Sequence, residues 1–461
     1  MNIYLHVEIA SRELDAKLLL GLVAAERGHD VVVGSIENMR TPLLKGWFPR
    51  GVFHTKDLCP TPNKVAFLEQ LKNRGFSITS QDEETSLIQD DRSRVINASR
   101  FGESSLSIVG SVFFFGDRDC LALADVYPAF NEKFVVTGSP RVDLWQTTAR
   151  ERLHRCSNEE PYIGILSNFG FPFFEDSIVA RLERSRKDNE LGDSLEYWQG
   201  RIKGQLRNTE IAFQFIEMIE AVAKAMPDTR FVVRPHPTES AGAWEHILGN
   251  RCANVTVEKK GSTHDFLVGA QGIIHSGCTT GFEAFFSQVP CISYCFAPDD
   301  GGYRSASALV NRLGIVTTNP AEVCAAVNSL KPEVKPEDTI SSDIKAELAK
   351  RVCSVGDLGG AHRIVDAWEN ASATDGNTRN SWKKAGALLA VREVKFLVHQ
   401  AISKLKSTKG TTEIKFPDLT KQQMLERFAH IKKRSGMVSS VKAVRLDRQL
   451  MLLKSSKKHY A

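Results

Sequence analysis

An alternation of short apolar runs and helical patterns constrains the fold of this chain more than any other feature. Residues 2–9 (NIYLHVEI) form an apolar run, residues 12–28 have apolar positions at helical spacing and end on Gly28, and residues 29–35 (HDVVVGS) form a second apolar run. A glycine directly after a helix is a common helix end. This pattern is typical of a strand–helix–strand unit with parallel strands and a right-handed crossover. We therefore expect an α/β fold.

The same alternation continues in two blocks along the chain. A polar stretch at residues 146–160 separates the first block from a second, which begins with the apolar run YIGILSN. A chain of 461 residues is also too long for a single core. We expect two doubly wound domains that face each other across a cleft, with ligands at the carboxyl ends of their strands. The predicted parts are a first domain at 1–150, a second at 151–335, a connector and closing helix at 336–370, and a basic helical tail at 371–461.

The charge of the chain is unevenly distributed. The formal net charge is +5, but residues 381–461 hold 19 Lys and Arg against 5 Asp and Glu, which leaves −9 for the rest. A basic segment with apolar stretches can bind an anionic membrane surface, where each Lys or Arg contributes about 1 kcal/mol. A solvated helical appendage or an oligomerisation arm explains the tail equally well. We expect no nucleic-acid partner, because no known binding module accompanies the charge.

Two further sequence features bear on location and cofactors. The N-terminal residues lack the pattern of a signal peptide, and no apolar run reaches 18 residues. We therefore expect a cytoplasmic protein, or one bound peripherally to the inner face of the cytoplasmic membrane. The nine cysteines form no CxxC pair, and no histidine completes a zinc pattern beside Cys291 and Cys295. We expect no metal ion and no other cofactor.

The segment FVVRPHPTES places two phosphate-binding side chains at the end of an apolar strand. Pro235 and Pro237 exclude helix and hold the residues between them at the strand end. Arg234 offers a planar donor fork, and His236 offers a proton near neutral pH. We predict that both contact a phosphate and that His236 protonates or stabilises it as it leaves. A proline-rich loop whose histidine caps a carbonyl is the alternative.

The segment GIIHSGCTTGFEAFFSQ combines an apolar strand, a turn of small and hydroxyl-bearing residues, and the start of a helix. The N–H groups at a helix N-terminus and its dipole favour anions. Glycines would let the backbone approach a phosphate closely, and a carboxylate in the first turn can reach ribose hydroxyls. An ordinary capped helix is the alternative. The predicted nucleotide-binding residues here are Ser276, Gly277, Thr279, Thr280, Gly281 and Glu283.

Acidic residues follow a predicted strand of the first block. Asp82, Glu83 and Glu84 stand together in SITSQDEETSL, and adjacent carboxylates raise one another's pKa. One of them could act as a base or nucleophile, although a solvated acidic loop is the equal alternative.

Charged residues also stand where acceptor recognition would be natural in the first block. Glu8 and Arg12 lie at the first strand–helix turn, and Arg141 follows the last strand of the block. We predict that these three residues line the acceptor side of the site.

The motifs resemble those of GT-B glycosyltransferases of the bacterial surface carbohydrate biosynthesis type. RPHP is similar to the HP motif of transferases that use CMP-activated Kdo or sialic acid, HSGCTTG to their Ser/Thr-rich motif, and DEET to their D/E-D/E-G motif. Thr85 stands where that last motif has Gly, which puts the loop conformation and the identity of the catalytic acid in question. The likeness covers about residues 1–370.

The resemblance implies a metal-independent enzyme that transfers a sugar from a CMP-linked donor to a capsule, lipopolysaccharide or other lipid-linked glycan acceptor. His236 would assist departure of the CMP phosphate, Glu283 would bind the ribose, and the hydroxyls of the Ser/Thr-rich turn would bind the phosphate. An acid of the group Asp82, Glu83 and Glu84 would be the base of an inverting reaction or the nucleophile of a retaining one. The alternatives are a UDP-sugar transferase or epimerase, a CDP-glycerol-type glycerophosphotransferase, and a non-catalytic nucleotide-binding scaffold.

Overall fold

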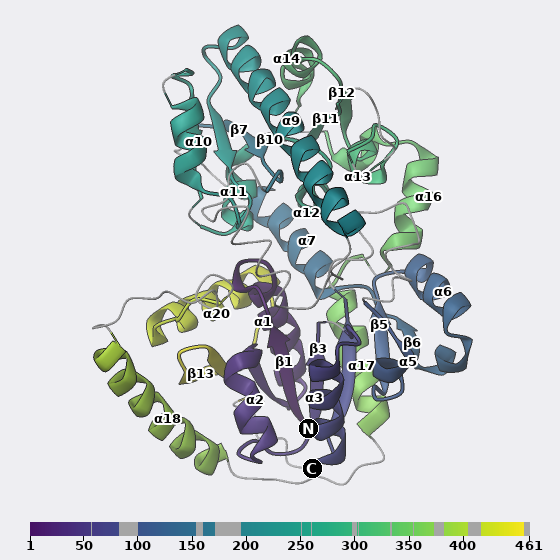
Figure 1. Cartoon of the computed structure of the whole chain (residues 1–461), viewed down its shortest axis with the longest axis vertical. Helices are drawn as coiled ribbons and strands as arrows, with labels where there is room; N and C mark the ends of the chain where they lie inside the picture. The colour runs from purple at the N-terminus through teal and green to yellow at the C-terminus, as the bar shows by residue number, and fades with distance from the viewer. Residues whose placement is uncertain are drawn as a thin grey trace. The chain divides into compact units, whose positions relative to one another are not determined.

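The computed structural model of the chain shows an α/β protein with two sheets, one mostly parallel and the other wholly parallel (Figure 1). It forms two compact units: the described residues of unit 1 lie within 1–147 and 347–461, and those of unit 2 lie within 148–346. Two helices cross the unit boundaries, α7 (Pro140–Leu153) and α16 (Ser342–Arg351). The structure describes residues 1–56, 58–82, 100–153, 160–170, 195–249, 251–259, 261–296, 302, 304–331, 334–353, 355–372, 382–403 and 416–455.

Unit 1 contains a sheet in the order β13-β14-β2-β1-β3-β4-β5-β6. The strands from β2 to β6 all pair in parallel, as the strand–helix–strand pattern predicts. The chain reverses its direction of progress across the sheet between β1 and β3, which makes the ends of these strands a topological switch point. The strand bounds are β1 Asn2–Val7, β2 Asp30–Ser35, β3 Val52–Thr55, β4 Ser77–Gln81, β5 Ser111–Phe114, β6 Phe134–Val136, β13 Lys442–Asp447 and β14 Leu450–Lys454.

Two cores cover the two faces of the unit 1 sheet. Side chains alternate along a strand, so Ile3 and Leu5 join one apolar cluster with helix α1, whereas Tyr4 joins the other with α3. Helix α1 ends before Gly28, whose φ of 90° is readily adopted by glycine. The unit 1 helices are α1 Ala10–Glu26, α2 Ile36–Leu44, α3 Pro62–Asn73, α5 Glu103–Leu106, α6 Asp117–Val126, the 3₁₀ helix η2 Pro128–Lys133, α17 Gly359–Ser372, α18 Trp382–Ser403 and α20 Lys421–Ser435, with most of α7.

Unit 2 contains a six-stranded sheet in the order β12-β11-β10-β7-β8-β9, with every pair parallel. Counted from the first strand of the unit, this is the Rossmann order, and its switch point lies between β7 and β10. The strands are β7 Tyr162–Leu166, β8 Phe231–Arg234, β9 Val255–Val257, β10 Ala270–His275, β11 Cys291–Tyr294 and β12 Ile315–Thr317. The helices are α9 Leu195–Ala225, α10 Ala241–Leu248, α11 Thr263–Gly269, α12 Thr279–Phe286, α13 Leu309–Arg312, α14 Pro320–Ser329 and α15 Pro336–Thr339.

The C-terminal segment departs from the predicted separate helical tail. Strands β13 and β14 form an antiparallel hairpin, and β14 pairs antiparallel with β2 to extend the unit 1 sheet. Helices α17 and α20 pack against α1, and Figure 1 shows α20 beside α1. Phe428, Ile431 and Leu453 are buried in the same core as α1. Residues 416–455 are therefore part of unit 1, and the closing helix α17 belongs to unit 1 as well.

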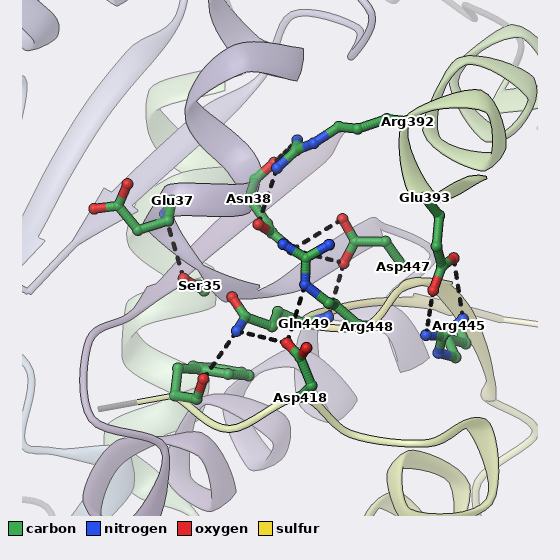
Figure 2. A network of polar contacts seen from close by, with 11 residues as sticks. Ser35, Glu37, Asn38, Arg392, Glu393, Asp418, Arg445, Asp447, Arg448 and Gln449 are labelled. Atoms are coloured by element: carbon green, nitrogen blue, oxygen red, sulfur yellow. Dashed lines mark hydrogen bonds and ion pairs between the residues drawn. The ribbon is translucent and has the colours of Figure 1, made fainter. Parts of the chain in front are cut away.

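A polar network joins this C-terminal segment to α2 and α18 (Figure 2). The Asn38 amide donates to both carboxylate oxygens of Asp447 at 3.2 Å. Arg392 on α18 donates to the backbone and side-chain oxygens of Asn38, both at 2.9 Å. The Gln449 N–H donates to Asp447 at 2.8 Å. Some of the basic residues that make the tail cationic in sequence are thus engaged inside unit 1.

The polar stretch expected at residues 146–160 is helical in its first part. Residues 146–153 form the last turns of α7, because they continue a helix that begins at Pro140.

Among the described helices, none is both long and apolar enough to cross a membrane.

Candidate functional site

The candidate site lies in unit 2, at the carboxyl ends of β7, β8 and β10. RPHP begins at the last residue of β8, and HSGC begins at the last residue of β10, so both motifs lie at strand ends as the sequence predicts. The loop after β7, residues 167–170, lies between them because β7 pairs with both β8 and β10. This is the position where open α/β sheets bind ligands.

A fully buried carboxylate organises two of these loops. Glu239 has no exposed surface, and it lies three residues after His236. Its own N–H donates to the His236 carbonyl at 2.8 Å, so the RPHP loop closes on itself. The Glu239 carboxylate accepts hydrogen bonds from the N–H groups of Phe169 (2.8 Å), Gly170 (2.7 Å) and His236 (3.3 Å), from the Trp244 indole (3.0 Å), and from the Ser167 hydroxyl. The Ser167, Phe169 and Gly170 donors belong to the loop after β7, and the His236 N–H belongs to the loop after β8, so Glu239 ties these two loops together.

The hydrogen bonds of His236 assign its tautomer. Its Nδ1 lies 2.8 Å from the Thr238 hydroxyl and 3.3 Å from the Thr238 backbone N–H. A backbone N–H can only donate, so Nδ1 is the acceptor and the neutral ring carries its proton on Nε2. A phosphate oxygen can accept a hydrogen bond from this Nε2–H. The ring is partly exposed, as a ligand-binding group must be.

Arg234 has a different environment from that of His236. Its guanidinium donates to the Gly261 carbonyl at 2.9 Å and lies 5.4 Å from the centre of the Phe266 ring. Burial lowers the pKa of Arg234, and the negative charges of Glu283 and Glu258 oppose this shift. Arg234 is the residue predicted to bind phosphate, and Glu283 is the residue predicted to bind ribose. The two side chains therefore interact electrostatically at this sheet edge.

The turn after β10 is held by amide contacts. Gly277 has a φ of 59°, a left-handed conformation that favours glycine. Its N–H donates to the Asn311 side chain at 3.1 Å, and its carbonyl accepts from the Asn168 amide at 3.2 Å. Both backbone groups of Gly277 thus contact asparagines, and the predicted approach of this backbone to a phosphate stays a prediction. Gly277 is needed for the turn itself.

The helix after this turn begins differently from the capping pattern in the sequence. Cys278 is the N-cap of α12, and its sulfur accepts from the Thr280 N–H at 3.4 Å. Thr279 and Thr280 are partly exposed in the first turn. The Ser276 hydroxyl is fully buried and has no hydrogen-bond partner among the residues that the structure describes. The phosphate-binding roles of these three hydroxyls stay predictions.

Gly281 allows α12 to pack closely on His275, and its predicted close approach to a phosphate stays a prediction. A Cβ at this position would lie 2.8 Å from Cε1 of His275, which real structures do not tolerate. His275 is fully buried beneath α12, with Nε2 3.1 Å from the Ser293 hydroxyl. Burial lowers its pKa to about 4, so it is neutral near physiological pH. It is therefore a core histidine.

Sequence reasoning missed the groups that join these loops. Arg304 is 7% exposed, donates to the Asn168 side chain and to the Ser276 carbonyl at 2.8 Å each, and lies 4.7 Å from the Phe169 ring. Asn311, Asn168 and Glu239 complete the same set of contacts. Their only sequence signal is position: Asn168 follows an apolar strand directly, and Glu239 follows His236 by three residues. Arg304 stands in a loop without periodicity, so no pattern marks it.

The residues predicted in the first domain lie in unit 1. Asp82 directly follows β4, is nearly buried and forms an ion pair with Arg100. Glu83 and Glu84 lie outside the described residues. Arg141 is 5% exposed and lies 5.1 Å from the centre of the Trp145 ring, so most of its surface is in contact with protein.

Glu8 and Arg12 both contact a buried carboxylate at the same turn, that of Glu13. Glu13 has no exposed surface; it accepts from the Glu8 N–H at 2.7 Å and pairs with Arg12 and Lys56 at 3.2 Å. Burial alone would raise the pKa of Glu13, but Lys56, Arg12 and the Glu8 N–H lower it to about 2. Lys56 also pairs with the Glu8 carboxylate at 2.7 Å. The first strand–helix turn is thus a compact charge network.

Comparison with known proteins gives matches among solved structures only. No protein-family model matches the chain, and no curated protein matches it. Similar structures include a UDP-GlcNAc 2-epimerase of Methanocaldococcus jannaschii in complex with UDP-GlcNAc and UDP, at 14% identity and TM-score 0.47, covering 80% of this chain and 100% of that one. The S. aureus MnaA–UDP structure has 12% identity and TM-score 0.45, covering 82% and 100%. The wall teichoic acid polymerase TagF has 10% identity and TM-score 0.43, covering 82% and 90%.

Proposed function

We propose that the chain is a glycosyltransferase that moves a sugar of the Kdo or sialic acid type from a CMP-linked donor to a bacterial surface glycan. The observation that carries the proposal is His236: its Nδ1 accepts a backbone N–H, and its loop is held by buried Glu239 at the end of β8. A donor N–H held in place beside a switch point suits the phosphate of a leaving nucleotide.

The reaction follows from these groups. An acceptor hydroxyl attacks the anomeric carbon, and the bond from that carbon to the phosphate oxygen breaks. The Nε2–H of His236 donates to the departing phosphate, whose charge it stabilises. In an inverting reaction the hydroxyl proton goes to a carboxylate, for which Asp82, Glu83 and Glu84 are the proposed group; in a retaining one a carboxylate attacks first. Neither route requires a metal ion.

The polar groups around His236 are proposed to bind the rest of the nucleotide. Thr279 and Thr280 would donate hydroxyl hydrogen bonds to the phosphate at the start of α12, where the helix dipole favours an anion. Glu283 would accept from ribose hydroxyls. Glu8, Arg12 and Arg141 of unit 1 remain the proposed acceptor-side residues. A lipid-linked acceptor would place the reaction at the cytoplasmic face of a membrane, which co-sedimentation with vesicles of anionic phospholipid tests.

The test combines nucleotide binding with one substitution. We expect CMP to raise the thermal unfolding temperature of the full chain more than CDP, UDP or GDP does, because a ligand stabilises the state that it binds. We expect His236→Ala to lower transfer by about 10²- to 10⁴-fold, the usual contribution of a positioned acid or base. His246→Ala, an exposed histidine on α10 of the same unit, is the matched control.

The outcomes separate the proposed function from its alternatives. A preference for UDP or CDP would replace the CMP-sugar donor with one of the other two donor classes. A lack of response to every nucleotide would favour the scaffold. Wild-type transfer by the His236→Ala variant would show that His236 has no part in the reaction.

A further inference from the structure

A cavity of about 350 Å³ lies in unit 1, at the carboxyl ends of β1, β2 and β3. This is the switch point of the unit 1 sheet, the position at which α/β sheets bind ligands. The volume lies at the lower end of the range for small-molecule sites, about 300–1,000 Å³. A cavity of this size holds one small ring, either as a free ligand or as one unit of a longer chain. Its lining comes from the three strands, from the first two turns of α2 and α3 with the residue before α3, and from Phe416 of the C-terminal segment.

The apolar part of the lining contains three phenylalanines together with Val7, Ile36 and Leu68. Phe53 and Phe67 lie edge to face, with ring centres 5.7 Å apart. Phe416 is 3% exposed, and its carbonyl accepts from the Gln449 amide at 2.8 Å. Gln449 in turn belongs to the polar network of Figure 2, through its N–H bond to Asp447. The network that anchors the C-terminal segment therefore also fixes this wall of the cavity.

The polar lining is balanced in charge. Glu8 and Glu37 contribute two carboxylates, and Arg40 and Lys64 contribute two cations. The other polar groups of the lining are the hydroxyls of Ser35, Thr55 and Thr61, the amide of Asn63 and the imidazole of His6. Carboxylates, hydroxyls and amides are the partners of ligand hydroxyl groups. A cavity with both signs of charge in equal number offers no net attraction for an anion such as a nucleotide.

We propose that this cavity binds a neutral sugar ring, with its apolar face against the phenylalanines and its hydroxyls toward the polar lining. The proposal rests on the proposed function in one respect, because it identifies the sugar as part of the acceptor glycan. Phe416 makes the C-terminal segment a determinant of acceptor specificity. The lining residues all belong to unit 1, so the site is complete within that unit.

Saturation-transfer NMR on the full chain tests the proposal, with glucose, galactose and N-acetylglucosamine as probes and their 6-phosphates as charged counterparts. We expect binding of at least one neutral sugar. Phe416→Ala should weaken it roughly three- to tenfold, the effect of losing an aromatic contact. Since Phe416 also packs in the core, Glu37→Gln on the exposed rim of the cavity is the second variant and should weaken binding as well. Val438→Ala, fully exposed in the same segment, is the matched control.

CMP binding to unit 2, measured in parallel, separates this proposal from the proposed function. Sugar binding that both cavity variants weaken, together with no CMP binding, would leave the sugar site standing and remove the donor assignment. The site is overturned if the chain binds no neutral sugar or prefers the 6-phosphates. It is also overturned if Phe416→Ala and Glu37→Gln bind sugar as the Val438→Ala control does.

Discussion

Glu239 shows how one side chain can position another at the residue scale. Its carboxylate accepts from donors in two loops, one of which carries His236. Donor groups buried around it would lose their partner if the carboxylate were removed, and each unsatisfied buried group costs about 1–3 kcal/mol. Glu239 is therefore a positioning residue that acts through the backbone of the RPHP loop.

We predict that Glu239→Gln lowers the free energy of unfolding of the full chain by about 1–3 kcal/mol, because an amide replaces one acceptor oxygen with a donor facing other donors. We also expect weaker CMP binding, measured by calorimetry at a temperature where the variant is folded. Glu245→Gln, exposed on the neighbouring helix α10, is the control. Equal stability and CMP affinity in the two variants would contradict a positioning role.

At the scale of elements, the pairing of β14 with β2 makes the C-terminal segment part of the unit 1 sheet. Leu450, Met451, Leu452 and Leu453 are all buried, although they follow a strongly basic stretch. Leu453 contacts α1 closely: a Cβ added to Gly21 of that helix would lie 2.9 Å from Leu453 Cδ1. The segment is therefore held by apolar burial as well as by the polar network.

Leu453→Ala tests this attachment. We predict a loss of about 2–5 kcal/mol in the free energy of unfolding, the usual cost of truncating a buried leucine. Urea denaturation followed by circular dichroism measures it, with Val438→Ala as the control. A detached tail would make the two variants indistinguishable.

At the scale of the whole molecule, two buried carboxylates of unit 1 give opposite dependences on pH. The pKa of Glu13 is lowered to about 2, so its contribution to stability is present above pH 4.5 and is lost as the pH falls toward 2. Burial raises the pKa of Asp143 to about 7, although hydrogen bonds from the backbone N–H groups of Gly360 and Ala361 oppose the shift. Its contribution is present below pH 3.8 and is lost as the pH rises through 7.

We predict that Asp143→Asn reduces the loss of stability between pH 5 and pH 8, because asparagine has no proton to release in that range. Urea denaturation of the wild type and the variant at both pH values measures the difference. Asp338→Asn, an exposed position on α15, should leave the wild-type difference unchanged. An Asp143→Asn variant with the wild-type pH dependence would show that Asp143 is ionised in the folded protein throughout this range.

Local patterns in the sequence were sufficient for the type and order of the main elements. The runs at 2–9, 12–28 and 29–35 became β1, α1 and β2, and RPHP and HSGC lie at strand ends as predicted. The physical reason is that periodicity and helix-ending glycines act within a few residues of chain. Such patterns report which face of an element is buried, and they do so without any knowledge of its partner.

Only the tertiary structure decided which elements became neighbours. The pairing of β14 with β2 joins residues more than 400 positions apart, and no local pattern specifies that partner. The same holds for Arg304 and Asn168, and for Phe416 at the strand ends of β1 and β3. Net charge in the tail indicated a solvated or membrane-facing segment, yet Arg392 and Arg445 bond within unit 1. Partner choice depends on burial and hydrogen bonding summed over the folded unit, which sequence periodicity does not contain.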